Sequence, residues 1–199
     1  MRNLKPSAGF TIIELLLVVG VLGVVSAISL PIVEQTIASF RLVGSARSVT
    51  NALAVAKIRA ASSFTRARLY VDLASRAHHL ETLDKSTTPP HWMTDGGSSL
   101  LPSTVTFGFS PVTTAPPHSQ ATIDQATPCT QDDGTVVAGT ACIMFNSRGV
   151  PINASGTPIS TGVLYITDGT AVYGVTVAAT GMIRLWRTFP LSTPSWVLQ

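Results

Sequence analysis

The stretch Gly9-Phe10-Thr11-Ile12-Ile13-Glu14-Leu15-Leu16-Leu17-Val18-Val19 decides the fold, because it opens a long apolar run that contains one acid. The run continues to Leu30 and is followed by Pro31, and Glu14 is its only ionisable side chain. A carboxylate within a membrane-spanning helix costs about 2.5–3.5 kcal/mol even on the insertion scale. We therefore expect Glu14 to have a specific positively charged partner.

A basic leader precedes the apolar run. Residues 1–9 carry Arg2 and Lys5 and no acid. If the chain is cut after Gly9, the new amino group at Phe10 becomes the nearest positive charge that the chain can offer to Glu14. The spacing thus predicts a charge pair between Glu14 and a free amino terminus at Phe10.

These residues resemble the processing site of type IV prepilins and type II secretion pseudopilins. The resemblance implies that the prepilin peptidase, a membrane-embedded aspartic peptidase, cuts between Gly9 and Phe10 and methylates the new amino terminus. It also implies that Glu14, as the fifth mature residue, neutralises the amino terminus of a neighbouring subunit when pilins or pseudopilins assemble. The implied location is the bacterial inner membrane, crossed once with the head in the periplasm, and then the pilus or pseudopilus filament.

Two other interpretations of the first 30 residues remain open. An ordinary secretory signal also has a basic start and an apolar core, and Val25-Ser26-Ala27 offers a small-residue cleavage site. A plain membrane anchor of about 20 apolar residues is the other. Neither explains Glu14.

The apolar run should be helical, because only a helix satisfies the backbone of a single segment inside a bilayer. We expect Pro31 to bend this helix without ending it. We therefore divide the chain into four predicted segments: a leader over residues 1–9, a membrane and assembly helix over 10–31, its amphipathic continuation over 32–62, and a β-rich head over 63–199. The continuation has an apolar face at Leu42, Ala46, Val49, Leu53, Ala56 and Ala60 and an opposite face at Ser45, Arg47, Ser48, Asn51 and Arg59.

The head shows a period of two, which is typical of strands. Strands are predicted over residues 66–73, 78–83, 104–109, 141–145, 163–166, 171–177 and 182–187, and Asp168-Gly169 predicts a hairpin turn. Residues 85–103 and 111–128 have the composition of loops, and the tail after Phe189 is predicted to be loosely ordered. The predicted fold class is α+β, a long pilin-like N-terminal helix packed on an antiparallel β-sheet head.

The chain has two cysteines, Cys129 and Cys142, in the part that would be translocated. Disulfides form and persist outside the cytoplasm, so we expect these residues to be bonded. A metal site is not expected, because no CxxC motif occurs and no histidine lies at ligand spacing from either cysteine. Asp132-Asp133-Gly134 lacks the further ligands of a calcium loop and indicates a turn.

Charge gives no global argument for nucleic-acid binding. The formal charge of +3 falls to +1 once Arg2 and Lys5 are removed. Residues 36–76 form a basic stretch with one acid, Asp72, and seven cations: Arg41, Arg47, Lys57, Arg59, Arg66, Arg68 and Arg76. We expect this stretch to contact solvent, neighbouring subunits or inner-membrane lipid rather than nucleic acid. No nucleophile, zinc-protease or phosphate-loop motif occurs in the sequence, so neither an enzyme nor a cofactor is expected.

The head also resembles GspH/FimT-type minor pseudopilins, through Cys142-Ile143-Met144-Phe145, Asn146-Ser147-Arg148-Gly149 and a last strand after Gly181. The resemblance implies a tip or initiation subunit of a type II secretion pseudopilus or a type IV pilus. The alternative is a FimT-like DNA receptor, whose relatives use a basic Gly-Arg-x-Arg motif. This chain reads Gly181-Met182-Ile183-Arg184-Leu185-Trp186-Arg187 instead, with the arginines displaced from the glycine. The candidate DNA contacts are Arg184, Trp186, Arg187 and Arg148.

Overall fold

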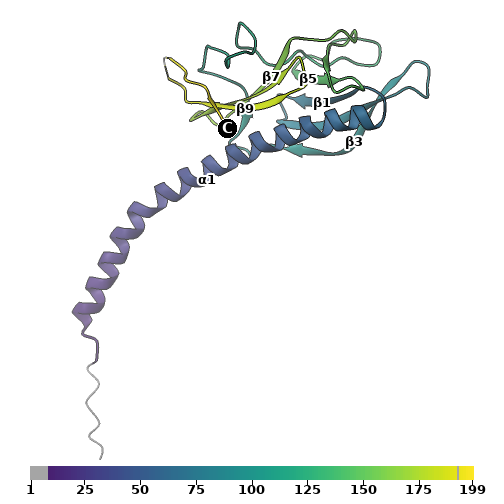
Figure 1. Cartoon of the computed structure of the whole chain (residues 1–199). Coiled ribbons are helices and arrows are strands. Elements are labelled where there is room, and N and C mark those ends of the chain that lie inside the picture. Colours follow the sequence, from purple (N-terminus) through teal and green to yellow (C-terminus); the bar gives the residue numbers. More distant parts are fainter. Residues whose placement is uncertain (1–8, 192) are drawn as a thin grey trace, which may run out of the picture. The chain divides into compact units, whose positions relative to one another are not determined.

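The chain divides into two units, Met1–Phe40 and Arg41–Gln199. A computed structural model describes residues 9–191 and 193–199, with the side chains of residues 30–32 left undescribed. The leader predicted over residues 1–9 therefore lies outside the described residues, except for Gly9. Figure 1 traces the course of the chain, and each unit is described by itself.

The first unit contains the start of helix α1, which spans Ile12–Ser62. Thr11 precedes the helix, and its Oγ1 accepts the backbone N–H of Glu14 at 3.3 Å. This is the bond of an N-cap residue, which satisfies one of the free donors of the first turn. The helix continues through Pro31, as predicted, while the expected bend stays a prediction.

The second unit holds the rest of α1, and its apolar face is buried as the sequence predicts. Leu42, Ala46, Val49, Leu53, Ala56 and Ala60 all belong to the main core. One residue assigned to the opposite face is placed wrongly, because Ser45 is buried. Its hydroxyl donates to the carbonyl of Arg41 at 2.8 Å, and this bond within the helix lets a polar side chain lie against the sheet.

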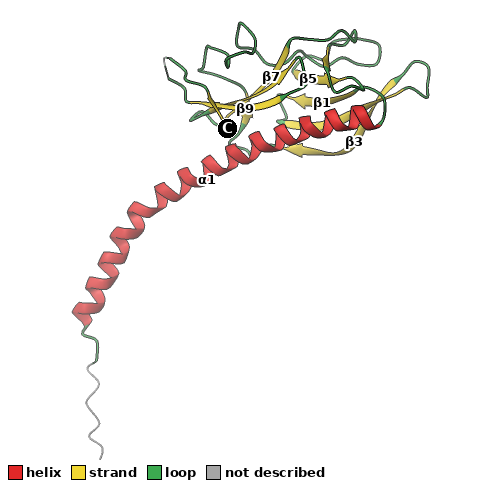
Figure 2. Ribbon diagram, in the orientation of Figure 1, coloured by secondary structure: helices red, strands yellow, loops and turns green. Residues whose placement is uncertain are grey.

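The strands form two antiparallel five-stranded sheets, coloured yellow in Figure 2. The first has the order β3-β2-β1-β5-β6, from β1 (Ala67–Asp72), β2 (Ala77–Asp84), β3 (His91–Leu100), β5 (Thr140–Phe145) and β6 (Pro151–Ile152). The second has the order β10-β9-β8-β7-β4, from β4 (Thr106–Phe107), β7 (Thr161–Thr167), β8 (Val172–Ala178), β9 (Ile183–Thr188) and β10 (Val197–Leu198). The α+β class is confirmed.

The expectation of a single sheet was wrong. Strand β1 pairs with β2 on one edge and with β5 on the other, and β4 pairs with β7. These partners are far apart in the chain, and the period of two shows a strand without showing its neighbour.

Both sheets contribute to one core with the helix, and β7 shows how the layers are organised. Leu164 and Ile166 belong to the main core with α1. Val163 and Tyr165 point to the other face of the same strand and join a smaller cluster with Val112. The segment predicted as a loop over residues 111–128 thus covers the second face of this sheet.

Strand β3 replaces part of the loop predicted over residues 85–103. It pairs antiparallel with β2, with a register irregularity opposite its glycines. The Gly-rich, Ser-rich composition indicated a loop, but the pairing with β2 and the packing of Trp92 on Arg68 override this local preference.

The tail after Phe189 is held more firmly than predicted. The Trp196 ring lies 6.1 Å from that of Tyr165, and its indole N–H donates to the carbonyl of Thr114 at 2.9 Å. Val197 and Leu198 then form β10 against β9. Like β6, β10 has two residues, too few for a period to be recognised.

Candidate assembly site and the polar surface of the head

The candidate processing and assembly residues lie together at the start of α1. Gly9, Phe10 and Glu14 are all exposed, and 79% of the Phe10 surface is accessible. Glu14 lies in the first helical turn, three residues after the capping Thr11. This is the Thr-x-x-Glu spacing of a capping box, in which the carboxylate stays near the helix start.

The position of Glu14 has an electrostatic consequence. Free N–H groups give a helix start a partial positive charge, which favours a carboxylate in the first turn and opposes an ammonium there. A cut before Phe10 would place a new ammonium next to this positive end. Glu14 is the acid of the first turn, so it is placed to offset that charge.

The apolar side chains between Glu14 and residue 37 have no cover where the structure describes them. Residues 10–29 and 33–37 are exposed, and α1 is the one helix among the described residues that is long and apolar enough to cross a membrane. None of its most apolar window is buried. Such a surface needs lipid or other apolar helices around it.

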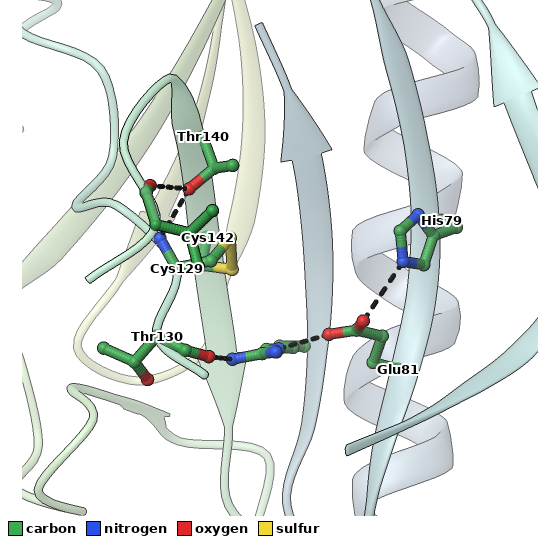
Figure 3. Close-up of a disulfide and its surroundings, with 8 residues drawn as sticks. His79, Glu81, Cys129, Thr130, Thr140 and Cys142 are labelled. Atoms are coloured by element: carbon green, nitrogen blue, oxygen red, sulfur yellow. Dashed lines mark hydrogen bonds and ion pairs between the residues drawn. A yellow bond between two sulfur atoms is a disulfide. The ribbon is translucent and has the colours of Figure 1, made fainter. Parts of the chain in front are cut away.

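On the head, the predicted disulfide between Cys129 and Cys142 is present and is drawn in Figure 3. It joins strand β5 to the loop of residues 129–139. The hydroxyl of Thr140 accepts the N–H of Cys129 at 2.9 Å and donates to the carbonyl of Val137 at 2.6 Å. The loop is therefore fastened at both its ends.

Beside this loop lies a buried polar cluster that the sequence did not reveal. Arg68 is only 3% exposed, and its Nε donates to Glu81 Oε2 at 2.5 Å while its Nη1 donates to the Thr130 carbonyl at 2.7 Å. His79 Nε2 lies 3.2 Å from the other oxygen of Glu81, and Figure 3 draws this contact as a dashed line between the two labelled side chains. The Arg68 guanidinium also lies 4.0 Å from the ring centre of Trp92.

In residues 66–73, Arg66, Arg68, Tyr70 and Asp72 alternate with apolar residues, and this pattern by itself predicts a half-buried strand with Arg68 on its polar face. That face is covered by β3 and by the disulfide loop, both of which are distant in sequence. The signal that could have indicated the cluster is the pair of opposite charges, Arg68 and Glu81, which face each other on β1 and β2, two strands that are consecutive in sequence.

The candidate DNA contacts do not form one surface of exposed side chains. Trp186 is 9% exposed, and its indole N–H donates to Thr176 Oγ1 at 3.1 Å, so its ring is not open for stacking on bases. The Arg187 guanidinium lies 4.6 Å from the ring centre of Phe189. Arg148 and Arg184 are exposed.

Most cations of the basic stretch are bound within the chain. Arg59 pairs with Asp95, and Arg66 and Arg76 donate to the carbonyls of Ala154 and Ser103. With Arg68 buried, no continuous stripe of free cations remains over residues 57–76 in the part of the chain that the structure describes.

The two turns that carried the GspH/FimT resemblance lie against each other. Gly149 and Gly181 both have positive φ, 74° and 76°, and a Cβ on Gly181 would overlap the carbonyl oxygen of Gly149. Lys57 of α1 reaches this junction and donates to the carbonyl of Gly181 at 2.9 Å. The last turn before β9 is thus tied to the helix and to the turn that contains Arg148.

Among the described residues, no three His, Cys, Asp or Glu side chains lie close enough together to hold a metal ion. His78 is the buried one, 3% exposed, and its ring lies edge-on to Phe107 at 6.3 Å. Burial lowers the pKa of His78, and the neighbouring charge of His79 adds to this.

In a comparison with known proteins, residues 4–30 match the family model described as the prokaryotic N-terminal methylation motif. No curated protein and no solved structure matches the chain. The motif implies processing by a prepilin peptidase and assembly with other pilins, and it fits a membrane anchor formed by the apolar part of α1. The motif, with a long apolar helix followed in sequence by antiparallel sheets, supports a type IV pilin-like prepilin.

Proposed function

We propose that this protein is a minor pilin or pseudopilin, a structural subunit without enzymatic activity that works at the tip or in the initiation of a filament. The observation that carries the proposal is Glu14 in the first turn of a helix whose apolar side chains are exposed over residues 12–29 and 33–37. Such an apolar surface gains most from packing against the same surface of other subunits, and the carboxylate of Glu14 within it then needs a cation.

The charge pair would form in three steps. The peptidase cuts between Gly9 and Phe10, and the amino terminus of Phe10 is methylated. The secondary ammonium keeps its positive charge. As helices gather, water leaves the space around Glu14, and the carboxylate pairs with the ammonium of its own or of a neighbouring subunit. In this low-dielectric bundle an unpaired charge is costly, so the pair selects the register in which subunits join.

A GspH/FimT-type head is supported by the junction of Gly149 and Gly181. The two segments that carry the resemblance are sequence-distant, yet they pack against each other and against Lys57. We place the head in the periplasm, where the disulfide between Cys129 and Cys142 would persist. No described feature favours DNA uptake over this role, since Trp186 is buried.

The test compares Glu14→Gln with Glu34→Gln in cells that make the filament. Both changes remove a carboxylate from the same exposed helix, but only Glu14 lies in its first turn. We expect both variants to insert and to be cleaved, because the cut precedes Phe10. Glu14→Gln should be lost from sheared filaments, and Glu34→Gln should be incorporated like the natural chain.

Three readouts separate the steps: chain mass for cleavage, membrane fractionation for insertion, and immunoblotting of sheared filaments for assembly. Normal incorporation of Glu14→Gln would contradict the proposed charge pair. Absence of the natural chain from the filament would contradict the proposed function itself.

A further inference from the structure

A hollow of about 550 Å³ opens on the face of the first sheet that lies away from α1. We call it the loop-side hollow, because the disulfide loop forms one wall. The side chains that the argument uses are Arg68, Tyr70, Trp92, Gln131, Asp132 and Asp133. None of them belongs to the N-terminal assembly site.

The floor of the loop-side hollow is a fixed hydrogen-bond donor. Arg68 is buried, and Glu81, the Thr130 carbonyl and the Trp92 ring hold its guanidinium from three sides. Its third nitrogen, Nη2, has no hydrogen bond to any described residue. A donor held this rigidly loses little entropy when it binds a ligand.

The rim supplies acceptors. Asp132 Oδ1 accepts the backbone N–H of Trp92 at 2.8 Å, which fixes the carboxylate and leaves Oδ2 without a partner among the described residues. Asp133 Oδ1 accepts the N–H of Thr135 at 2.8 Å, and that bond lowers the pKa of Asp133, so the group stays ionised. Gln131 adds an amide that both donates and accepts.

The charges around the hollow argue against an ionic ligand. Three carboxylates line it, those of Glu81, Asp132 and Asp133, so an anion is repelled. The positive guanidinium of Arg68 occupies the floor, so a cation is repelled from the deepest point. A neutral hydroxyl suits both kinds of lining group, because it donates to a carboxylate and accepts from a guanidinium.

Two aromatic rings complete the lining. Trp92 and Tyr70 line the hollow beside these polar groups; Arg68 covers one face of the Trp92 ring and His79 one face of the Tyr70 ring, and the Trp92 backbone is fixed by Asp132. Small-molecule sites combine such apolar walls with a few placed polar groups. A sugar ring has the same two aspects, with C–H groups on its faces and hydroxyls around its edge.

We propose that the loop-side hollow binds a neutral saccharide, with hydroxyls bonded to Arg68 Nη2 and Asp132 Oδ2 and a ring face against Trp92. The site is separate from the filament contacts of α1 and would let an assembled subunit hold a glycan. In this proposal the disulfide also holds in place the loop that carries Asp132 and Asp133, in addition to stabilising the fold.

The experiment uses the full chain in lipid nanodiscs, prepared without sugar-based detergents because these would compete. Saturation-transfer difference NMR is recorded with maltose, cellobiose and diacetylchitobiose, with empty nanodiscs as the blank. We expect transfer to at least one of these disaccharides, strongest at the C–H protons of one ring face. Glucuronic acid, as an anionic probe, should give none.

Two variants make the test specific. Asp132→Asn with Asp133→Asn keeps both Oδ1 acceptors and the loop, yet removes two charges, and should weaken binding about tenfold or more because hydrogen bonds to charged groups are the stronger ones. Asp124→Asn is the matched control, an exposed acid outside the hollow, and should bind like the natural chain.

Three results would overturn the proposal. The first is absence of transfer from every disaccharide to the folded natural chain. The second is unchanged transfer in the double variant. The third is transfer to butylammonium but to no saccharide, which would make the hollow a cation site. Filament incorporation, measured separately, should be the same for the double variant and the natural chain.

Discussion

Glu81→Gln should destabilise the head strongly, because it leaves Arg68 charged and buried without its counter-ion. The Arg68 and Glu81 side chains are 4% and 11% exposed, and they meet at 2.5 Å. Removing one partner of a buried ion pair costs about 3–5 kcal/mol. We take the lower end, about 3 kcal/mol, because glutamine keeps the shape of Glu81 and one acceptor oxygen.

Asp95→Asn is the matched control, since Asp95 pairs with Arg59 at the surface. These side chains are 26% and 48% exposed, so solvent screens the pair and its loss should cost below about 1 kcal/mol. The assay is thermal unfolding, followed by circular dichroism, of residues 41–199, the unit that holds the whole buried core.

At about 2–4 °C per kcal/mol for a domain of this size, Glu81→Gln should lower Tm by roughly 6–12 °C. Asp95→Asn should lower it by less than about 4 °C. Replacing both partners, Arg68→Met with Glu81→Leu, should recover most of the loss, because no unpaired charge remains. Equal Tm values for Glu81→Gln and Asp95→Asn would show that the buried ion pair contributes no more than the surface pair.

Three further predictions concern the head. Gly181→Ala should lower the free energy of unfolding by about 1–3 kcal/mol more than Gly169→Ala, since both glycines have positive φ but only the Cβ at 181 meets backbone; equal effects in urea would count against this. Replacing Cys129 and Cys142 by serine should remove ~3 kcal/mol on the chain-entropy model, and unchanged urea midpoints would contradict it. Burial lowers the pKa of His78 below its unfolded value, so the unfolded chain binds the proton more readily. The free energy of unfolding should therefore be full above about pH 6.5 and fall below that pH, and it should fall less in His78→Gln. Parallel pH profiles of the two proteins would contradict this role of His78.

The helix and its two faces could be predicted from the sequence because they depend on local periodicity. Leu42, Val49 and Leu53 are buried where a 3.6-residue period puts them. The hairpin at Asp168-Gly169 has a local signal too, and β7 and β8 pair across it. Ser45 escaped the pattern because a serine can satisfy its hydroxyl within the helix.

The features that the sequence missed all depend on packing between elements, which a local pattern does not show. Strand β3 forms because β2 pairs with it, although its glycines and serines favour a loop. Arg68 is buried because β3 and the disulfide loop cover one face of β1, which alternation alone marks as half exposed. Trp186 is buried although alternation alone puts it on the same strand face as Arg184, and its indole N–H finds its partner in Thr176 on the neighbouring strand β8.

The N-terminal site was recognised from sequence because its residues are contiguous. Leader charge, Gly9, Phe10 and the position of Glu14 all lie within 14 residues, and the methylation motif matches the same stretch. The role of Glu14 in assembly stays a prediction, because it depends on other subunits.

The most direct test of the central claim is the intact mass and N-terminal sequence of the chain purified from membranes. We expect a chain that begins at Phe10 and is heavier than the cut sequence by one CH2, because a methyl group replaces one hydrogen of the amino terminus. A chain that begins at Met1, or one cut after Ala27, would contradict it, because Glu14 would then have no methylated amino terminus at Phe10 to neutralise.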